Sequence, residues 1–438
     1  FIPNTEVTVH SCRTNLPPNT AFRGFGAPQG MFVIEAAIAK AAGELKIPAR
    51  TIQQANFLKE NDMFQYGQVA LGVNIGKCFS DLDREFRIGK IEKEIAEFNE
   101  RETFFRKGFS LMPVCFGISF TNTSMNHARA LVHLYQDGSI GISTGAVEMG
   151  QGVNAKLAQV AAGLFSVDPA RVKIETTNTT RVANTSPTAA SSGADLNGNA
   201  LLIAGNKLVE RLKDVAGQML GCNPGEIKLH EEKVLRSGTP TDITWEKLVR
   251  EAFLRRVPLT ENGHYTTPVI YFDKSKEKGH PFAYHVYGTA VITVLLDCLR
   301  GTYKIEKVLI VHDFGNSFNP AIDRGQLEGG VMQGIGWMTM EEVLFNSEGR
   351  MLTDSLSTYK VPDIYSAPEI FEYRALETEG PEPALLKSKA IGEPPFMYGI
   401  GAYFALHNAI RSFNPSWKPD FDAPMTPEKV LMRLYDKK

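Results

Sequence analysis

Three short segments, far apart along the chain, restrict the fold most strongly, because each combines glycine with a polar or charged residue. They are residues 22–26 (FRGFG), 149–152 (MGQG) and 392–395 (GEPP). Glycine allows a backbone to approach a ligand closely, and the two prolines after Glu393 hold that carboxylate in a rigid turn. The side-chain amide of Gln151 can both donate and accept hydrogen bonds. Together, the segments indicate a buried site for a polyanionic cofactor.

Length and charge narrow the possible partners. A chain of 438 residues predicts about two to four compact units, at roughly 100–200 residues per domain. Its 47 Lys and Arg residues nearly balance its 49 Asp and Glu residues, and the formal net charge is -2. Such a chain has no basic field to attract nucleic acid or an anionic membrane surface. We therefore expect neither as a partner.

The cysteines show no spacing typical of a metal site, an iron–sulfur site or a disulfide framework. They are Cys12, Cys78, Cys115, Cys222 and Cys298. Reduced thiols in a cytoplasmic protein are the expected state. No apolar run approaches the roughly 18 residues that span a bilayer. The chain opens at Phe1 and not at Met, so either a segment was removed or the chain is part of a longer polypeptide.

Hydrophobic periodicity predicts an α+β (mixed α/β) fold without internal repeats. We expect one integrated body. The predicted helices cover 29–45, 81–100, 154–165, 198–212 and 326–334, with a short helix after the cap Thr426-Pro427-Glu428. The predicted hairpins pair 128–135 with 139–143 and 288–296 with 302–311.

Two of these helix starts favour anions. Gly150-Gln151-Gly152 lies between the first hairpin and the helix that begins at Asn154, which is a strand, glycine loop, helix arrangement. Free backbone N–H groups at a helix start attract a phosphate or a similar anion. Residues 186–195 are small and hydroxyl-rich and precede the next helix. Taken alone, that second run is better explained by tight helix packing.

Five motifs, in order, resemble the C-terminal part of the molybdenum-cofactor domain of the xanthine dehydrogenase and aldehyde oxidase family. They lie at 15–26, 116–121, 148–152, 184–191 and 388–395. Five ordered motifs over several hundred residues are highly specific. The resemblance implies that residues 1–438 form the C-terminal portion of a molybdopterin-binding catalytic domain, with a molybdenum–molybdopterin cofactor. It also implies two elongated subdomains, with approximate lobes 1–145 and 146–438.

The resemblance also assigns roles to residues. Glu393 would be the catalytic base, although an isolated Glu in a turn is usually solvated. Phe25 and Phe120 would stack on the two faces of an aromatic heterocycle, and Thr121 would hydrogen-bond its ring, although an isolated phenylalanine is more often ordinary core. The implied cofactor-binding residues are Arg23, Gly150, Gln151, Ala189, Ala190, Ser191 and Gln326. Arg23 and Ala190 would lie in the molybdenum–pterin environment, with no direct protein ligand to the metal.

The resemblance implies oxidation of xanthine or hypoxanthine, with water as the oxygen donor. An aldehyde or another N-heterocycle is the alternative substrate, and a cofactor-free structural subunit is a third possibility. The family's 2Fe-2S clusters and FAD would belong to partner chains or domains, as would the upstream half of the molybdenum domain. A dimer of the assembled complex is expected.

Overall fold

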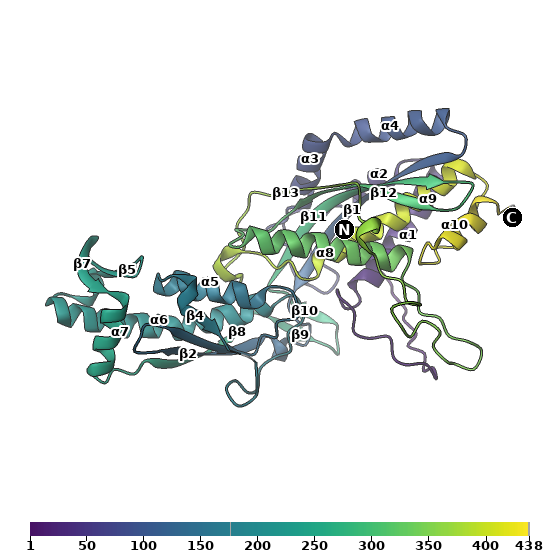
Figure 1. Ribbon diagram of the computed structural model, residues 1–438. Helices are drawn as coiled ribbons and strands as arrows, with labels where there is room; N and C mark the ends of the chain where they lie inside the picture. Colours follow the sequence, from purple (N-terminus) through teal and green to yellow (C-terminus); the bar gives the residue numbers. More distant parts are fainter. Residues whose placement is uncertain (176, 437–438) are drawn as a thin grey trace. The chain divides into compact units, whose positions relative to one another are not determined.

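A computed structural model of the protein describes residues 1–175 and 177–436 (Figure 1). The chain divides into two compact units. The first unit comprises residues 1–117, 284–379 and the chain from 391 onward, and the second comprises 118–283 and 380–390. These boundaries differ from the predicted lobes 1–145 and 146–438. They differ because strand β1 (Phe105–Ile118) pairs with β11 (Tyr284–Asp297), so the chain returns to the first unit after building the second.

The first unit is built on a four-stranded sheet with the order β1-β11-β12-β13. Strand β11 is antiparallel to β12 (Tyr303–His312), which confirms the predicted hairpin, and β12 is parallel to β13 (Ile370–Ala375). Both faces of the sheet are buried. Val291 faces a core that contains α3, whereas Ile292 faces one that contains α8 and α9, as the alternation of side chains along a strand requires.

Helices and short strands complete the first unit. The predicted helices at 29–45 and 326–334 are confirmed inside longer helices, and Thr426 Oγ1 caps α10 by accepting a hydrogen bond from Lys429 N at 3.4 Å. The helices are α1 (Ala27–Leu45), α2 (Ala49–Ala55), α3 (Ile75–Phe86), α4 (Ile88–Arg101), α8 (Pro320–Thr339), α9 (Gly401–Phe413) and α10 (Pro427–Leu434).

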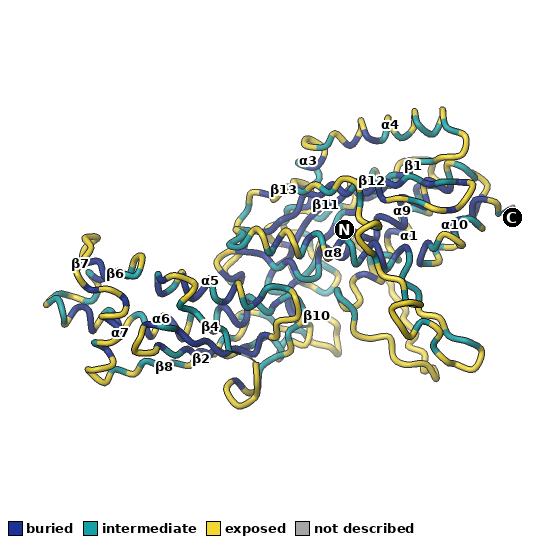
Figure 2. The backbone as a smooth tube through the Cα atoms, in the orientation of Figure 1, coloured by how far each residue is buried: buried dark blue, intermediate teal, exposed yellow. Residues whose placement is uncertain are grey.

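The prediction of one continuous helix over 81–100 is wrong. Arg87 adopts a left-handed conformation, with φ 54° and ψ 63°, and separates α3 from α4. The Asp83 carboxylate then accepts a hydrogen bond from Ile88 N at 3.0 Å, which satisfies an N–H group at the start of α4. Figure 2 shows α4 as mostly exposed or intermediate, and its buried residues are Ile88 and Ile91.

The second unit packs helices α5 (Val153–Phe165) and α6 (Gly193–Leu220) with a sheet of order β4-β3-β2-β8. Strands β2 and β3 are antiparallel, which confirms the predicted first hairpin, and the helices predicted at 154–165 and 198–212 lie within α5 and α6. The remaining elements are β2 (His127–Leu134), β3 (Ile140–Thr144), β4 (Val172–Ile174), β5 (Ile227–His230), β6 (Lys233–Arg236), β7 (Thr239–Thr244), α7 (Trp245–Leu254), β8 (Thr260–Thr266), β9 (Tyr271–Asp273) and β10 (Lys278–His280). Within the described ranges, no helix is long and apolar enough to cross a bilayer.

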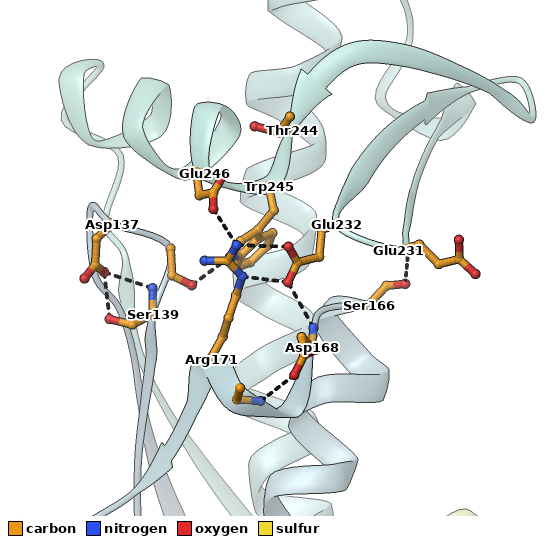
Figure 3. A network of polar contacts seen from close by, with 12 residues as sticks. Asp137, Ser139, Ser166, Asp168, Arg171, Glu231, Glu232, Thr244, Trp245 and Glu246 are labelled. Atoms are coloured by element: carbon orange, nitrogen blue, oxygen red, sulfur yellow. Dashed lines mark hydrogen bonds and ion pairs between the residues drawn. The ribbon is translucent and has the colours of Figure 1, made fainter.

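An ion-pair network around Arg171 joins several elements of the second unit (Figure 3). Arg171 Nε and Nη2 donate to the two carboxylate oxygens of Glu232 at 2.6 and 2.9 Å, and Nη2 also donates to Glu246. Glu232 Oε1 accepts a further bond from Asp168 N at 3.0 Å. Because the arginine fork binds a carboxylate through two parallel bonds, this geometry is among the stronger ones for an ion pair near the surface.

Replacing Glu232 with glutamine is expected to lower the free energy of unfolding by about 0.5–1.5 kcal/mol near neutral pH. Hydrogen bonds from Arg171 and from the Asp168 N–H hold the pKa of Glu232 below its usual value. Because the folded-state pKa is depressed, the stabilisation is present above the ordinary glutamate pKa and disappears as the pH falls through the folded-state value.

Urea unfolding of the wild type and the Glu232→Gln variant, near neutral pH and in acid, measures this difference. The matched control is Glu231→Gln, because the neighbouring Glu231 side chain is 85% exposed. We expect no change in the control. Equal losses in the two variants, or a loss that does not shrink in acid, would contradict the prediction.

Candidate functional site

In the first unit, the structure brings together three of the predicted site residues. Arg23 Nε donates to the carbonyl oxygen of Gly392, and Arg23 Nη2 donates to Gln326 Oε1 at 3.3 Å. The Glu393 carboxylate accepts a hydrogen bond from Gly24 N at 3.2 Å, across a separation of 369 residues. Arg23, Gln326 and Glu393 therefore form one cluster, which we call the Arg23 cluster.

Arg23 is half-buried and lies close to the Glu393 carboxylate. Burial lowers the pKa of the Arg23 guanidinium from its usual value, and the nearby Glu393 acts in the opposite direction. The hydrogen-bond acceptors of Arg23 are uncharged oxygens, namely the Gly392 carbonyl and the side-chain amides of Gln326 and Gln333. A half-buried cation whose hydrogen bonds go to uncharged oxygens can attract a further anionic group. This part of the chain therefore fits the polyanionic cofactor that the sequence predicts.

The backbone around residue 24 explains why glycine is needed there. Gly24, Phe25 and Gly26 all have positive φ, at 93°, 43° and 98°. A Cβ on Gly24 would lie 2.7 Å from Met397 Cε and 2.7 Å from Pro28 Cγ. The tight turn leaves the Phe25 side chain 73% exposed, so the alternative of ordinary core packing is wrong for this residue. Glu393 is half-buried, which is less exposed than an isolated surface turn would leave it.

In the second unit, the glycine loop at 149–152 has the predicted place between β3 and α5, but its N–H groups are not free. Glu148 Oε1 accepts from Gly150 N and Gly152 N, both at 2.9 Å, and Oε2 accepts from Asn154 N at 3.0 Å. Partial burial opposes ionisation of Glu148, yet these backbone donors lower its pKa. The prediction of free N–H groups is therefore wrong, because a carboxylate of the chain itself occupies the helix start.

The side chain of Gln151 folds back on the same loop. Its Oε1 accepts from Met149 N at 2.7 Å, and its Nε2 donates to Val147 O at 2.8 Å. Contact with a ligand would require the amide to exchange these local bonds. A Cβ on Gly150 would meet no atom within 4 Å, so open space remains next to the loop.

The second predicted helix start is at α6, where Ala190 and Ser191 both have a φ of 54°. It lies beside the glycine loop, because Val147 N donates to Thr188 Oγ1 at 3.0 Å. Tight packing also occurs, since a Cβ on Gly198 would overlap with the Leu385 side chain. The packing of the following helix is therefore tight, and the anion-binding role of this run stays a prediction.

Three buried polar atoms near this helix start have no hydrogen-bond partner within residues 1–175 and 177–436. They are Thr185 Oγ1, Ser186 Oγ and Asn197 Oδ1. An unsatisfied buried polar group costs about 1–3 kcal/mol. Two hydroxyl donors without acceptors fit an oxygen-rich ligand, and this supports the expectation that the cofactor contacts residues 189–191.

Phe120 and Thr121 follow β1 and differ in burial. Phe120 is half-buried and Thr121 is exposed. The buried Asn126 side chain fixes the Phe120 backbone, because its Oδ1 accepts from Phe120 N and its Nδ2 donates to Phe120 O, both at 2.9 Å. Phe120 belongs to the second unit and Phe25 to the first. The predicted stacking of both rings on one substrate stays a prediction.

Several residues of the site were missed in the sequence. Gln333 binds Arg23 Nη1 at 3.3 Å, and it follows Gln326 by two helical turns on α8, a spacing that places both on one face. The sequence could have indicated Glu148, because this residue lies immediately before the glycine loop. No sequence pattern indicated Asn126, because its role depends on a local turn that brings it back to Phe120.

Comparisons with known proteins identify relatives of this chain. Two family models, each described as a molybdopterin cofactor-binding domain, match residues 1–57 and 81–368. Xanthine dehydrogenase/oxidase of Felis catus is 38% identical over 99% of this chain, which covers 32% of that protein. Xanthine dehydrogenase of Oryza sativa subsp. japonica is 37% identical over 99% of this chain, which covers 31% of that protein. The chain thus spans about a third of the length of these relatives.

Solved structures show the same fold. Quinoline 2-oxidoreductase from Pseudomonas putida 86 superposes with a TM-score of 0.81 at 22% identity, covering 95% of this chain and 53% of that one. The aldehyde oxidoreductase from Desulfovibrio desulfuricans ATCC 27774 superposes with a TM-score of 0.77 at 22% identity, covering 94% of this chain and 41% of that one.

The match to the family model over residues 81–368 defines a molybdopterin cofactor-binding protein. More narrowly, the chain belongs to the xanthine dehydrogenase and aldehyde oxidase family, which confirms the resemblance seen in the sequence and the α+β class.

Proposed function

We propose that this chain forms the C-terminal portion of the molybdopterin-binding catalytic domain of a molybdenum hydroxylase that oxidises xanthine or hypoxanthine. The observation that carries the proposal is the Arg23 cluster, in which the half-buried Glu393 carboxylate lies close to the half-buried Arg23 guanidinium. The names of the relatives at 37–38% identity support the purine substrate.

When bound, the molybdenum cofactor supplies a two-electron acceptor, with water as the source of the inserted oxygen. Arg23 and Gln326 in the first unit, and the loops at 150–151 and 189–191 in the second, would hold this cofactor. Glu393 would accept a proton at its carboxylate, and the Gly24 N–H, at 3.2 Å, orients that group. Phe25 and Phe120 would hold the flat ring, and Thr121 would hydrogen-bond its polar edge.

The proposal includes parts outside this chain. Electrons would pass to 2Fe-2S clusters and FAD on partner chains or domains, and the upstream half of the molybdenum domain would complete the cofactor site. The short match of one family model, at residues 1–57, and the threefold greater length of the relatives support this. A dimeric assembly and a cytoplasmic location stay predictions.

The test is substrate profiling of the purified complete enzyme, combined with molybdenum analysis. We expect molybdenum to be present and kcat/KM to be higher for xanthine than for an aromatic aldehyde. A preference for the aldehyde would favour the aldehyde or N-heterocycle alternative. Absence of molybdenum and of both activities would favour the cofactor-free structural subunit.

Phe25→Ala, Phe120→Ala and Thr121→Val are each expected to lower the ratio of kcat/KM for xanthine over an aliphatic aldehyde. Loss of ring stacking costs about 1–3 kcal/mol in transition-state stabilisation for a flat purine. Loss of the hydroxyl leaves a polar substrate atom unpaired. An aliphatic aldehyde has no ring to contact and should lose less.

Steady-state kinetics with both substrates give these ratios. The matched controls are Phe104→Ala in the first unit and Phe253→Ala in the second, because these side chains are 49% and 52% exposed and lie outside the site. Equal losses on both substrates would mean that Phe25, Phe120 and Thr121 shape the pocket in general, and the purine-specific assignment would give way to the broader hydroxylase.

A further inference from the structure

Glu393, the proposed base, is the N-cap residue of a short helix, η6 (Pro394–Ile400), and all seven residues of that helix are buried. Pro394 and Pro395 fix the backbone immediately after Glu393, because a proline ring locks φ. Phe396 N also donates to Glu393 O at 3.1 Å. Glu393 therefore moves with η6, and whatever sets the orientation of η6 also sets the direction of the carboxylate.

One side of η6 packs directly against the backbone of α8. A Cβ on Gly334 would overlap with the Phe396 carbonyl oxygen and would lie 3.0 Å from Gly399 Cα. Such a close approach fixes the distance between the two helices. The Phe396 ring of η6 also packs edge-on against Phe22, with ring centroids 5.1 Å apart, which restrains the rotation of η6 on that side.

A polar side chain of η6 adds a directional restraint, because a hydrogen bond depends on orientation as well as distance. Tyr398 is the one residue of this helix that carries a side-chain hydrogen-bonding group, and it is completely buried. Its hydroxyl shares a hydrogen bond of 2.7 Å with His312 Nδ1. Gly288 on β11 makes room for the contact, because a Cβ there would overlap with the Tyr398 hydroxyl. A hydrogen bond that is buried in an apolar core has no water to replace it.

The partner of Tyr398 is itself fixed. His312 ends β12 and is fully buried. The next residue, Asp313, accepts hydrogen bonds from Asn74 Nδ2 at 2.9 Å and from Gly315 N at 3.2 Å. His312 thus lies at the end of an inner strand that is paired on both sides, and its bond to Tyr398 ties the orientation of η6 to that sheet.

We propose that Tyr398 and His312 are a positioning pair that fixes the direction of the Glu393 carboxylate. Neither residue touches the proposed cofactor or substrate groups. This inference rests on the proposed role of Glu393 as the base. Because the pair acts on geometry, its loss should lower the rate of the chemical step and leave substrate binding unchanged.

The test uses Tyr398→Phe, which removes one hydroxyl, together with His312→Leu and His312→Asn. The asparagine Oδ1 takes the place of His312 Nδ1 and keeps a hydrogen-bonding atom there. In the complete enzyme, we expect Tyr398→Phe and His312→Leu to lower kcat by about 10- to 100-fold with KM unchanged, and His312→Asn to retain most of the wild-type kcat.

Hydrogen exchange provides a measurement that does not depend on activity. The amides of Gly24 and Phe396 bond to Glu393, so peptides that contain them should exchange faster in Tyr398→Phe and His312→Leu. The matched control is Tyr403→Phe on α9. Tyr403 is also fully buried in the same core, but its hydroxyl has no partner among the described residues. We expect wild-type kcat and exchange for this control.

The outcomes separate this inference from the proposed function. If Glu393→Gln is inactive while Tyr398→Phe has the wild-type kcat and exchange, the positioning role is wrong and the role of Glu393 stands. Similar losses of kcat in Tyr398→Phe and Tyr403→Phe would also rule out the positioning role of Tyr398 and His312. If Glu393→Gln is active, the base assignment fails, and with it the inference. Should Tyr398→Phe misfold, the comparison of His312→Asn with His312→Leu decides the question.

Discussion

Replacing Glu393 with glutamine should lower kcat by about 10²–10⁴-fold or more, because an amide cannot accept the proton that a carboxylate base accepts. Glutamine keeps the length of the side chain and an Oε1 that can still accept the bond from Gly24 N. The Arg23 contacts to Gly392 and Gln326 involve other atoms and should persist. We therefore expect the molybdenum content to match that of the wild type.

Steady-state kinetics and metal analysis of the same preparation test this prediction. Glu382→Gln is the control, because Glu382 is exposed and lies outside the Arg23 cluster. A near-normal kcat in Glu393→Gln would rule out the base assignment. A loss of molybdenum in parallel with activity would instead make Glu393 a residue needed for cofactor retention.

The second large effect is expected at Gly334, where alanine should destabilise the protein by about 1–3 kcal/mol or more. In most helices a change from glycine to alanine stabilises by up to about 1 kcal/mol, since alanine loses less backbone entropy. At Gly334 the new Cβ would overlap with the Phe396 carbonyl oxygen, so α8 and η6 would have to separate. Because η6 begins after Glu393, activity should fall as well.

Gly329→Ala on the same helix is the matched control. A Cβ at Gly329 would meet no atom within 4 Å. Thermal unfolding of the complete enzyme should therefore show a lower Tm for Gly334→Ala and an equal or higher Tm for Gly329→Ala. If both variants had the same Tm, close backbone packing between α8 and η6 would not contribute to stability.

Burial in the first unit shows one limit of reading helices from sequence. In α1, the apolar Ile34 is 39% exposed, whereas its neighbour Glu35 is buried. Gln53 Nε2 donates to Glu35 Oε2 at 2.7 Å, and burial raises the pKa of this carboxyl to about 7. A buried glutamate follows from the packing of α1 against α2 and β1, and no periodicity within α1 predicts it.

The sequence by itself determined the local elements and the family. The two hairpins, the helix after the glycine loop and the Thr426 cap follow from interactions between residues close in the chain, which short patterns describe well. The five motifs were sufficient to identify the family, because each motif is specific and their order along the chain adds further information.

Only the tertiary structure decided how these pieces meet. The bond from Arg23 to Gln326 spans 303 residues, and the one from Gly24 to Glu393 spans 369. The boundaries of the two units depend on the pairing of β1 with β11, and the bond between His312 and Tyr398 depends on Gly288. The carboxylate of Glu148 at the helix start of α5 likewise depends on the exact path of a loop. Such contacts form when distant segments pack together, and the local preferences of a sequence do not encode which distant atoms will meet.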